Sequence, residues 1–279
     1  MSTNIKNPAV SVVMATFNEP VDVIKKSIGS ILSQTFSDFE LLIIDDSTSV
    51  DTKNEIDSFS VDNRVKVIRE SKRIGFVKSL NLGLLNAKGQ YIARMDGDDI
   101  SIENRFEIQV NYLKEHSSVS IVGGAMYIID ETDQVISYRT YPTSTFFLKW
   151  SSVYRTPLAN PTIMMRQECV RNGFLYNELF KKSEDLEFWL RLMKNGYKLA
   201  NMSDFLLKYR VCGDLSNKRV SNHWSYNFKA RTKNFTLKYP IFSILSVMVS
   251  FLYTIMPKFI ISFIYKSENN KSLKTHKLL

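Results

Sequence analysis

Two kinds of apolar pattern alternate along the first hundred residues of the chain. Short runs rich in β-branched residues predict buried strands at 9–18, 39–51, 64–71 and 90–99. Residues 21–34 and 76–89 instead place apolar side chains at helical spacing, and Gly89 is expected to end the second helix. The resulting order (strand, helix, strand, strand, helix, strand) is typical of an α/β protein with a mostly parallel, doubly wound sheet.

Polar side chains gather where the predicted strands end, at Asn18, Asp45, Asp46, Asp96 and Asp98. Ligands of doubly wound sheets bind beyond the carboxyl ends of the strands. Because several strands end in polar residues at this edge, we expect a ligand site there.

Asp96 and Asp98 flank Gly97 at the end of the fourth predicted strand. Alternate residues of an extended chain point the same way, and glycine lets the backbone approach a ligand closely. Hard oxygen ligands suit Mg²⁺ or Mn²⁺. The alternative is a solvated turn in which Asp99 or Ser101 caps a helix over 101–113.

Two other candidates also have an ordinary structural explanation. Asp45 and Asp46 can bind a base or ribose, or they can cap the helix that follows them. Phe17 can stack on a base or pack in the core.

The pattern changes after about residue 111. Residues 118–141 predict two strands joined by an acidic turn, and hence an antiparallel or mixed extension of the sheet. Residues 183–200 predict a helix that Gly196 ends. Its apolar face consists of Leu186, Trp189, Leu190 and Met193.

Glu184 and Asp185 begin this helix, where its dipole favours a negative charge. The dipole alone accounts for carboxylates at this position. The same dipole keeps a carboxylate ionised and therefore able to accept a proton as a general base.

The C-terminal part of the chain is apolar and basic. Residues 241–256 carry no charge, and basic segments flank them at 227–239 and 266–279. The net charge of +9 indicates an anionic partner, and its placement beside an apolar run favours a membrane surface over nucleic acid. We expect this segment to lie on the membrane rather than to span it, because a spanning helix needs about 20 apolar residues. The alternative is a C-terminal helical hairpin that packs on the domain.

Domain organisation and compartment follow from the same patterns. We expect an α/β half over 1–110, a second half of the same domain with a mixed sheet over 111–215, and a helical, membrane-associating segment over 216–279. Cys169 and Cys212 provide no disulfide framework, and the first residues lack the pattern of a secretory signal. Both observations favour the cytoplasm.

The combination of motifs resembles the family 2 glycosyltransferases of bacterial cell-surface polysaccharide synthesis. The motifs are VSVVMATFNEP, SILSQTFSDFELLIIDDST, GFVKSLNLGL, GQYIARMDGDD, SEDLEFWLRL and YRV, and they occur in the family's order between about residues 9 and 216. The resemblance implies the Rossmann-like GT-A fold with a mostly parallel sheet, a mixed acceptor-side extension, and an inverting transfer of sugar from a nucleotide donor, UDP on family grounds. It also implies a divalent cation, Mn²⁺ or Mg²⁺. By the same resemblance, residues 1–110 would be the nucleotide-sugar-binding half and residues 111–215 the half that binds the acceptor and carries the catalytic base.

Residue roles follow from the resemblance motif by motif. Asp98 would coordinate the cation and Asp185 would be the general base. Residues expected to contact the nucleotide sugar are Thr16, Phe17, Asn18, Glu19, Asp45, Asp46, Lys78, Asn81, Arg94, Asp96 and Gly97. For Arg94 a structural ion pair with one of the aspartates remains an equal alternative. Residues expected to contact the acceptor or donor are Glu184, Trp189 and Arg210.

Cys212 departs from the pattern, because many relatives have a metal-binding histidine at this position. The function that the resemblance implies is transfer to a hydroxyl of a lipid-linked oligosaccharide on the inner face of the plasma membrane, in O-antigen, capsule or exopolysaccharide synthesis. No nucleic acid partner is expected. The alternatives are a nucleotidyltransferase and a non-catalytic nucleotide- or membrane-binding protein.

Overall fold

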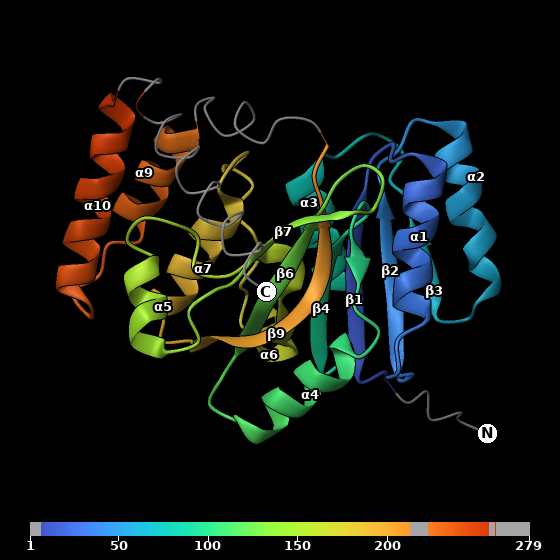
Figure 1. The fold of residues 1–279 in the computed structure, drawn as a ribbon, viewed down its shortest axis with the longest axis horizontal. Helices are drawn as coiled ribbons and strands as arrows, with labels where there is room; N and C mark the ends of the chain where they lie inside the picture. Colours follow the sequence, from blue (N-terminus) through green and yellow to red (C-terminus); the bar gives the residue numbers. More distant parts are fainter. Residues whose placement is uncertain (1–6, 213–222, 257–259, 261–279) are drawn as a thin grey trace. The chain divides into compact units, whose positions relative to one another are not determined.

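The computed structural model describes residues 7–212, 223–256 and 260, and it forms two compact units (Figure 1). Unit 1 comprises Met1–Val122 and Asn160–Tyr176, and unit 2 comprises Gly123–Ala159 and Asn177–Leu279. The predicted segment 266–279 lies outside the described residues.

The sheet of unit 1 has four parallel strands in the order β3-β2-β1-β4, followed by the antiparallel strand β8. The strands are β1 (Val10–Thr16), β2 (Phe39–Asp45), β3 (Val65–Ile68), β4 (Tyr91–Asp96) and β8 (Met164–Arg166). Every residue of β1 and β2 is buried, because helices cover both faces of a doubly wound sheet. The α/β class with a mostly parallel sheet is therefore confirmed.

The register of the strands brings their carboxyl ends together. Thr16 of β1 pairs with Asp45 of β2, and Ala15 pairs with Asp96 of β4. The polar residues that follow these strands therefore lie along one edge of the sheet, as predicted.

The helices of unit 1 include the two predicted over 21–34 and 76–89, and the structure adds a helix, α2, between the second and third strands, where the predicted order had none. The helices are α1 (Val21–Leu32), α2 (Val50–Ser58), α3 (Phe76–Asn86), α4 (Arg105–Glu115) and α6 (Gln167–Arg171), with short 3-10 turns η1 (Phe59–Val61) and η2 (Asn160–Thr162). A helix after Asp45 and Asp46 was the alternative explanation of these two carboxylates, and α2 is that helix. Ser49 caps it by accepting a hydrogen bond from the Thr52 amide at 3.3 Å.

The predicted start of the helix after the acidic turn is wrong. Residues Ile100–Ser101 form a short strand, β5, and α4 begins only at Arg105. The side chain of Gln34 accepts a hydrogen bond from the Phe106 amide at 3.1 Å and donates one to the Ile102 carbonyl oxygen at 2.7 Å. A side chain from the end of α1 thus takes the capping role that local sequence assigned to Asp99 or Ser101.

The predicted role of Gly89 is also wrong, because α3 ends at Asn86. Gly89 instead passes close to β1, where its amide donates to Ser11 Oγ at 2.8 Å. A Cβ atom on Gly89 would lie only 2.5 Å from the Ser11 backbone nitrogen. The position therefore requires glycine because of close backbone approach.

Unit 2 contains the antiparallel extension that the sequence predicts. Its strands are β6 (Ile121–Ile129), whose first two residues belong to unit 1, β7 (Val135–Arg139) and β9 (Leu199–Arg210). Its helices are α5 (Thr145–Ser151), α7 (Glu184–Lys194), α9 (His223–Lys233) and α10 (Pro240–Ile255). Strands β6 and β7 pair antiparallel through an acidic turn in which Asp130 accepts bonds from the amides of Thr132 and Gln134.

The two predicted helices of unit 2 are present. Gly196 follows α7 with a φ of 92°, a conformation that glycine adopts without strain. Helix α10 covers most of the apolar run at 241–256. Within residues 7–212, 223–256 and 260, no helix has the combination of length and apolar character that a bilayer crossing requires.

The close approach at Gly89 gives a test of the packing. Gly89→Ala should lower the free energy of unfolding by about 1–3 kcal/mol, since overpacking against backbone atoms cannot be relieved by a rotamer change. The matched control is Gly29→Ala in α1, where a Cβ atom would meet nothing within 4 Å. That variant should be more stable by about 0.5–1 kcal/mol, because alanine is the better helix former. Urea unfolding of both variants measures the difference, and equal stabilities would contradict the prediction.

Candidate active site

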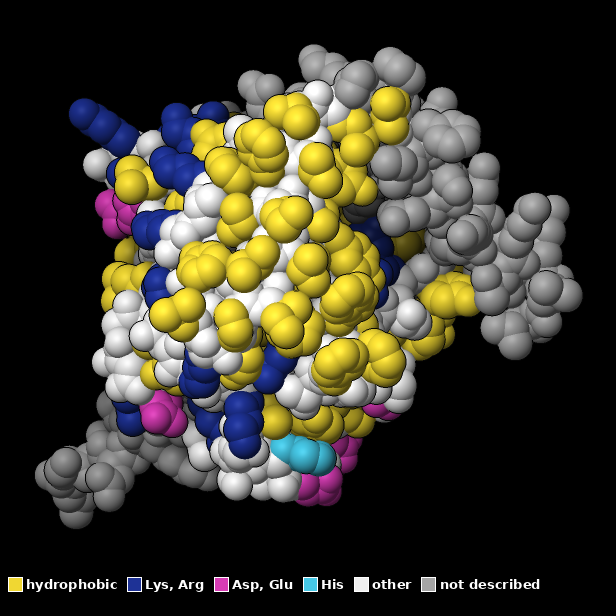
Figure 2. Space-filling view, turned by 90° about the vertical axis from the view of Figure 1, so that its left-hand side faces the viewer, with side chains coloured by type: hydrophobic (Ala, Val, Ile, Leu, Met, Phe, Trp, Pro, Cys, Tyr) yellow, Lys and Arg dark blue, Asp and Glu magenta, His cyan; other side chains and the backbone are white. Residues whose placement is uncertain are grey.

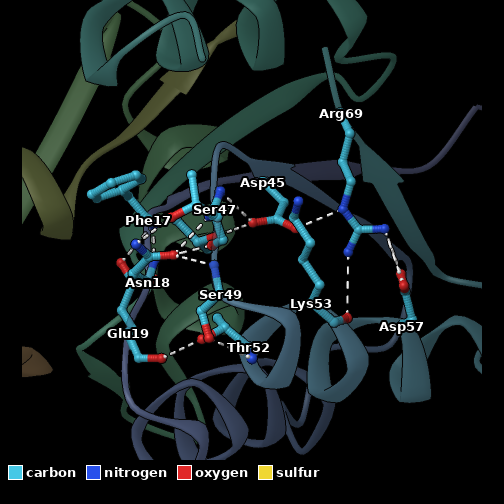
Figure 3. Close-up of polar contacts among 12 residues, drawn as sticks. Phe17, Asn18, Glu19, Asp45, Ser47, Ser49, Thr52, Lys53, Asp57 and Arg69 are labelled. Atoms are coloured by element: carbon cyan, nitrogen blue, oxygen red, sulfur yellow. Dashed lines mark hydrogen bonds and ion pairs between the residues drawn. The ribbon is translucent and has the colours of Figure 1, made fainter. Parts of the chain in front are cut away.

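The candidate site of unit 1 lies at the carboxyl ends of β1, β2 and β4. Two loops that follow β1 and β2 meet there and share a network of hydrogen bonds (Figure 3). The network decides which polar residues face a ligand and which hold the edge of the sheet together.

Asn18 joins the end of β1 to the segment after β2. Its Oδ1 accepts hydrogen bonds from the amides of Thr48 and Ser49, both at 2.8 Å, and its Nδ2 donates to Thr48 Oγ1 at 2.9 Å. It adopts a φ of 59°, a left-handed conformation that asparagine tolerates better than most residues. Asn18 therefore acts in the structure as a clamp between two loops (Figure 3).

Asp45 is buried and bonded on several sides. It accepts hydrogen bonds from Arg69 Nε at 2.6 Å, the Ser47 amide at 3.0 Å and Thr16 Oγ1 at 3.2 Å (Figure 3). Burial raises the pKa of Asp45, but the bonds from Ser47 and Arg69 outweigh it and leave the pKa below its ordinary value. The carboxylate is thus fixed in its charged form within the protein.

Asp46 holds the segment that leads into α3. Its carboxylate accepts hydrogen bonds from the amides of Ile74 at 2.9 Å and Gly75 at 2.8 Å. Arg73 reaches the same carboxylate at 3.7 Å, and its guanidinium lies 3.7 Å from the centroid of the Phe17 ring. Asp46, Arg73 and the half-exposed Phe17 ring therefore form one small surface.

The end of β4 is fixed by an ion pair. Both guanidinium NH groups of Arg94 donate to the Asp96 carboxylate, one of them at 2.7 Å. Burial lowers the pKa of Arg94, but the charge of Asp96 and its hydrogen bond outweigh burial and raise it. The structural ion pair that the sequence left open for Arg94 is thus present.

Asp96, Asp98 and Asp99 each offer a carboxylate oxygen to one location, with these oxygens within 4.8 Å of one another. Gly97 lies tightly between them and the first loop, since a Cβ atom there would be 3.0 Å from Thr16 Cγ2 and 3.2 Å from Glu19 Oε1. Burial raises the pKa of Glu19 to about 7, and the charges of Asp98 and Asp96 add to the effect.

This donor set fits a divalent cation. Mg²⁺ and Mn²⁺ prefer clustered carboxylate oxygens and retain positions for water or phosphate. The negative charge of the same carboxylates also favours a bound cation at this location. Asp98, which the sequence assigns to the metal, is within the cluster.

Two residues of α3 were also predicted to lie near the donor. Lys78 is exposed in the first turn of the helix. Asn81 is buried, where it donates to the Tyr176 carbonyl oxygen at 2.9 Å and accepts from the Tyr176 amide at 2.8 Å. Donor contacts for both remain predictions.

In unit 2, Glu184 and Asp185 lie in the first turn of α7, half-buried. Asp185 Oδ1 accepts a hydrogen bond from the Leu186 amide at 2.7 Å. The preceding residue, Ser183, has a φ of 57° and turns the chain into the helix. The position at a helix N-terminus is the one that the sequence predicts for the base, and its role remains a prediction.

Trp189 and Arg210, expected to contact the acceptor or donor, are both buried, and those contacts remain predictions. Trp189 is fully buried within unit 2. Arg210 is buried at the end of β9, where it pairs with Asp133 and donates to the Asp130 carbonyl oxygen at 3.1 Å. Cys212 is exposed just after this strand, and both cysteines are free thiols among the described residues.

Arg73 is the site residue that sequence reasoning missed. It belongs to the loop between β3 and α3, one of the loops at the ligand-binding edge of the sheet. Its position in a basic loop just after a parallel strand was the available signal. Its partners, Phe17 and Asp46, are distant in sequence and are visible only in the structure.

Comparisons with known proteins agree with the fold. The model of glycosyl transferase family 2 matches residues 11–171, more than half of the chain. An uncharacterized glycosyltransferase of Methanocaldococcus jannaschii is 32% identical over 76% of this chain and 73% of its own length. The O-antigen biosynthesis glycosyltransferase WbnJ of Escherichia coli is 31% identical over 82% of this chain and 91% of its own length.

Two solved structures share the fold. TarS of Staphylococcus aureus, residues 1–349 in complex with UDP, matches with a TM-score of 0.62 at 20% identity. The match covers 80% of this chain and 64% of that one. A mannosyltransferase of Pyrobaculum calidifontis in complex with GDP-Man and Mn²⁺ matches with a TM-score of 0.61 at 14% identity, over 88% of this chain and 70% of that one.

The chain belongs to glycosyl transferase family 2. It is an enzyme with the GT-A fold, and its relatives include enzymes of polysaccharide synthesis. The family membership favours sugar transfer over both alternatives that the sequence left open, a nucleotidyltransferase and a non-catalytic binding protein.

The bond between Asp46 and the loop before α3 gives a prediction. Asp46→Asn should speed amide hydrogen exchange at Ile74 and Gly75 by about fivefold to tenfold, since hydrogen bonds to a charged acceptor are worth about 1 kcal/mol more than those to a neutral one. Asp51→Asn, at an exposed position in the first turn of α2, is the matched control and should leave this exchange unchanged. Unchanged protection in Asp46→Asn would contradict the role assigned to Asp46.

Proposed function

We propose that this family 2 glycosyltransferase transfers a sugar from a UDP-linked donor to a hydroxyl of a lipid-linked oligosaccharide, with inversion at the anomeric carbon. The reaction serves O-antigen, capsule or exopolysaccharide synthesis on the inner face of the plasma membrane, where the enzyme is peripheral. The observation that carries the donor part is the cluster of Asp96, Asp98 and Asp99 at the end of β4. The names of the polysaccharide-synthesis relatives support the acceptor part.

The nucleotide site of this proposal is the surface formed by Phe17, Asp46 and Arg73. The exposed ring of Phe17 offers a stacking face for a base, and Asp46 offers hydrogen-bond acceptors to the base edge. Arg73 adds a cation beside both. Asn18 and Asp45 stabilise the loops that carry this surface, through their hydrogen bonds to Thr48 and Arg69.

Asp98 would hold the divalent cation, with Asp96 or Asp99 beside it. A bound Mn²⁺ or Mg²⁺ would neutralise the charge that develops on the leaving diphosphate. Asp96, whose carboxylate Arg94 holds in place, would contact the donor's ribose or diphosphate.

Asp185 would act on the acceptor. As the acceptor hydroxyl attacks the anomeric carbon, the carboxylate takes its proton, and the nucleotide leaves from the opposite face of the sugar. A single base suffices for one inverting displacement. The N-terminus of α7 favours the ionised, proton-accepting form.

A thermal-shift panel of nucleotide sugars tests the donor part. A UDP-sugar with Mn²⁺ at about 100 times its dissociation constant should stabilise the enzyme by about 2.7 kcal/mol, seen as a rise of several degrees in Tm. Asp98→Asn should lose the Mn²⁺-dependent part of this rise. Asp51→Asn is the matched control. A panel in which no nucleotide sugar raises Tm, with or without Mn²⁺, would refute the donor assignment.

Substitution of the proposed base tests the chemistry separately. Asp185→Asn should lower kcat by about 10²- to 10⁴-fold, since it removes general-base catalysis. The Tm rise with donor should stay the same, because the donor residues are intact. Transfer of labelled sugar to extracted lipid-linked acceptor measures kcat, with Asp204→Asn, an exposed carboxylate of β9, as control. Full activity in Asp185→Asn would exclude it as the base.

A further inference from the structure

A broad apolar surface of unit 2 has no role in the site described above (Figure 2). It is formed by α10 and α5, and we call it the α5–α10 face. Its members are Phe146, Phe147, Trp150, Ile241, Ile244, Met248, Phe251, Leu252 and Ile255. Monomeric soluble proteins rarely expose contiguous apolar patches of this kind, so the face calls for an occupant.

Helix α10 is amphipathic, but it turns small polar residues toward the protein and apolar residues toward the outside. The two residues that it buries are Ser246 and Ser250. Its six members of the α5–α10 face are between 49% and 68% exposed. A helix that served only to complete the core would point its apolar side chains inward, so the outward apolar stripe of α10 is suited to a surrounding of low polarity.

Helix α5 extends this stripe into a continuous face. Phe242 of α10 lies edge-on to Phe146 and Trp150 of α5, with ring centroids 6.0 Å and 6.4 Å apart. Lys149 of α5 lies 4.1 Å from the ring of Tyr239, which precedes α10. Two helices distant in sequence thus contribute to one surface within unit 2.

The segments that carry this face have charged side chains of positive sign only. Residues 140–158 and 223–256 contain six Lys and Arg residues and neither Asp nor Glu. In Figure 2, dark blue side chains border the yellow face. A hollow beside the start of α10 is lined by Lys194, Arg231 and Tyr239, among others.

This composition distinguishes between possible occupants. A second copy of the chain would bring basic borders together, and like charges in contact are unfavourable. An anionic lipid bilayer instead accepts apolar and aromatic side chains at the acyl boundary and attracts lysines to its headgroups. Trp and Tyr at the border are typical of that interface.

We propose that the α5–α10 face docks the enzyme on an anionic membrane surface, with the apolar side chains at the acyl boundary and the lysines at lipid phosphates. The inference deepens the membrane part of the proposed function and rests on it for its biological sense. What it adds is a defined surface, which includes α5 as well as the C-terminal helix.

Vesicle co-sedimentation of the full chain tests the proposal. Vesicles of phosphatidylcholine with phosphatidylglycerol should bind the protein, and binding should weaken as salt is raised. The double variant Met248→Glu, Leu252→Glu should bind at least about tenfold more weakly, because two apolar side chains are lost from the interface. Lys149→Gln and Lys238→Gln should each weaken binding by about fivefold on anionic vesicles only.

The matched control carries Val61→Glu and Leu85→Glu, two exposed apolar positions of unit 1, and should bind as the unaltered protein does. Unaltered Tm values establish that each variant folds. Three results would overturn the proposal: no binding to anionic vesicles, equal binding by the α10 double variant, or a dimer in size-exclusion chromatography that this variant dissociates. The donor-induced rise in Tm reports on unit 1, so loss of docking and failure of the donor assignment can be told apart.

Discussion

The ion pair between Arg94 and Asp96 is the constraint on which the candidate site depends. Arg94 is buried in β4. An unpaired guanidinium at this position would lower the free energy of unfolding by roughly several kcal/mol. Its pairing with Asp96 fixes the last residue of the strand and therefore the direction in which Gly97 and Asp98 leave it. A second buried cation, Arg105, binds the Arg94 carbonyl oxygen at 2.8 Å; burial lowers its pKa to about 9, against the charge of Asp99. The acidic turn is thus supported by two cations beneath it.

This arrangement separates the polar residues at the edge of the sheet by task. Asn18 and Asp45 form hydrogen bonds with other residues of the chain, and these bonds hold the loops after β1 and β2 together. Asp98 is half-buried and the ring of Phe17 is 39% exposed, so both remain open to a ligand. The supporting residues matter for a donor site because a few tenths of an ångström at a loop change the position of every group that it carries. A residue can therefore be essential here without touching a substrate.

The order of the elements and the edge that carries the site could be predicted, because both depend on local patterns. Continuous apolar runs and helical spacing reveal a parallel sheet, and the register of β1 with its neighbours brings the strand ends together. The sequence could not reveal that Gln34 caps α4 or that Arg69 neutralises Asp45, because those partners are brought together by tertiary structure. Trp189, which periodicity placed on the apolar face of its helix, is buried in the structure, whereas periodicity gives no information on a substrate contact.

The apolar run at the C-terminal end shows a different limit. Its composition predicts contact with a membrane surface. Composition does not tell which side of α10 faces outward or that α5 continues the same apolar stripe. The structure answers both, since Ser246 and Ser250 face inward and Phe242 contacts α5. Exposing such a face costs free energy in water, and docking would recover that cost. For an enzyme whose acceptor is carried by a lipid, docking would also confine enzyme and acceptor to one surface and so raise the acceptor's effective concentration. The apolar face would then contribute to turnover even though the carboxylate cluster at the end of β4 belongs to the other unit.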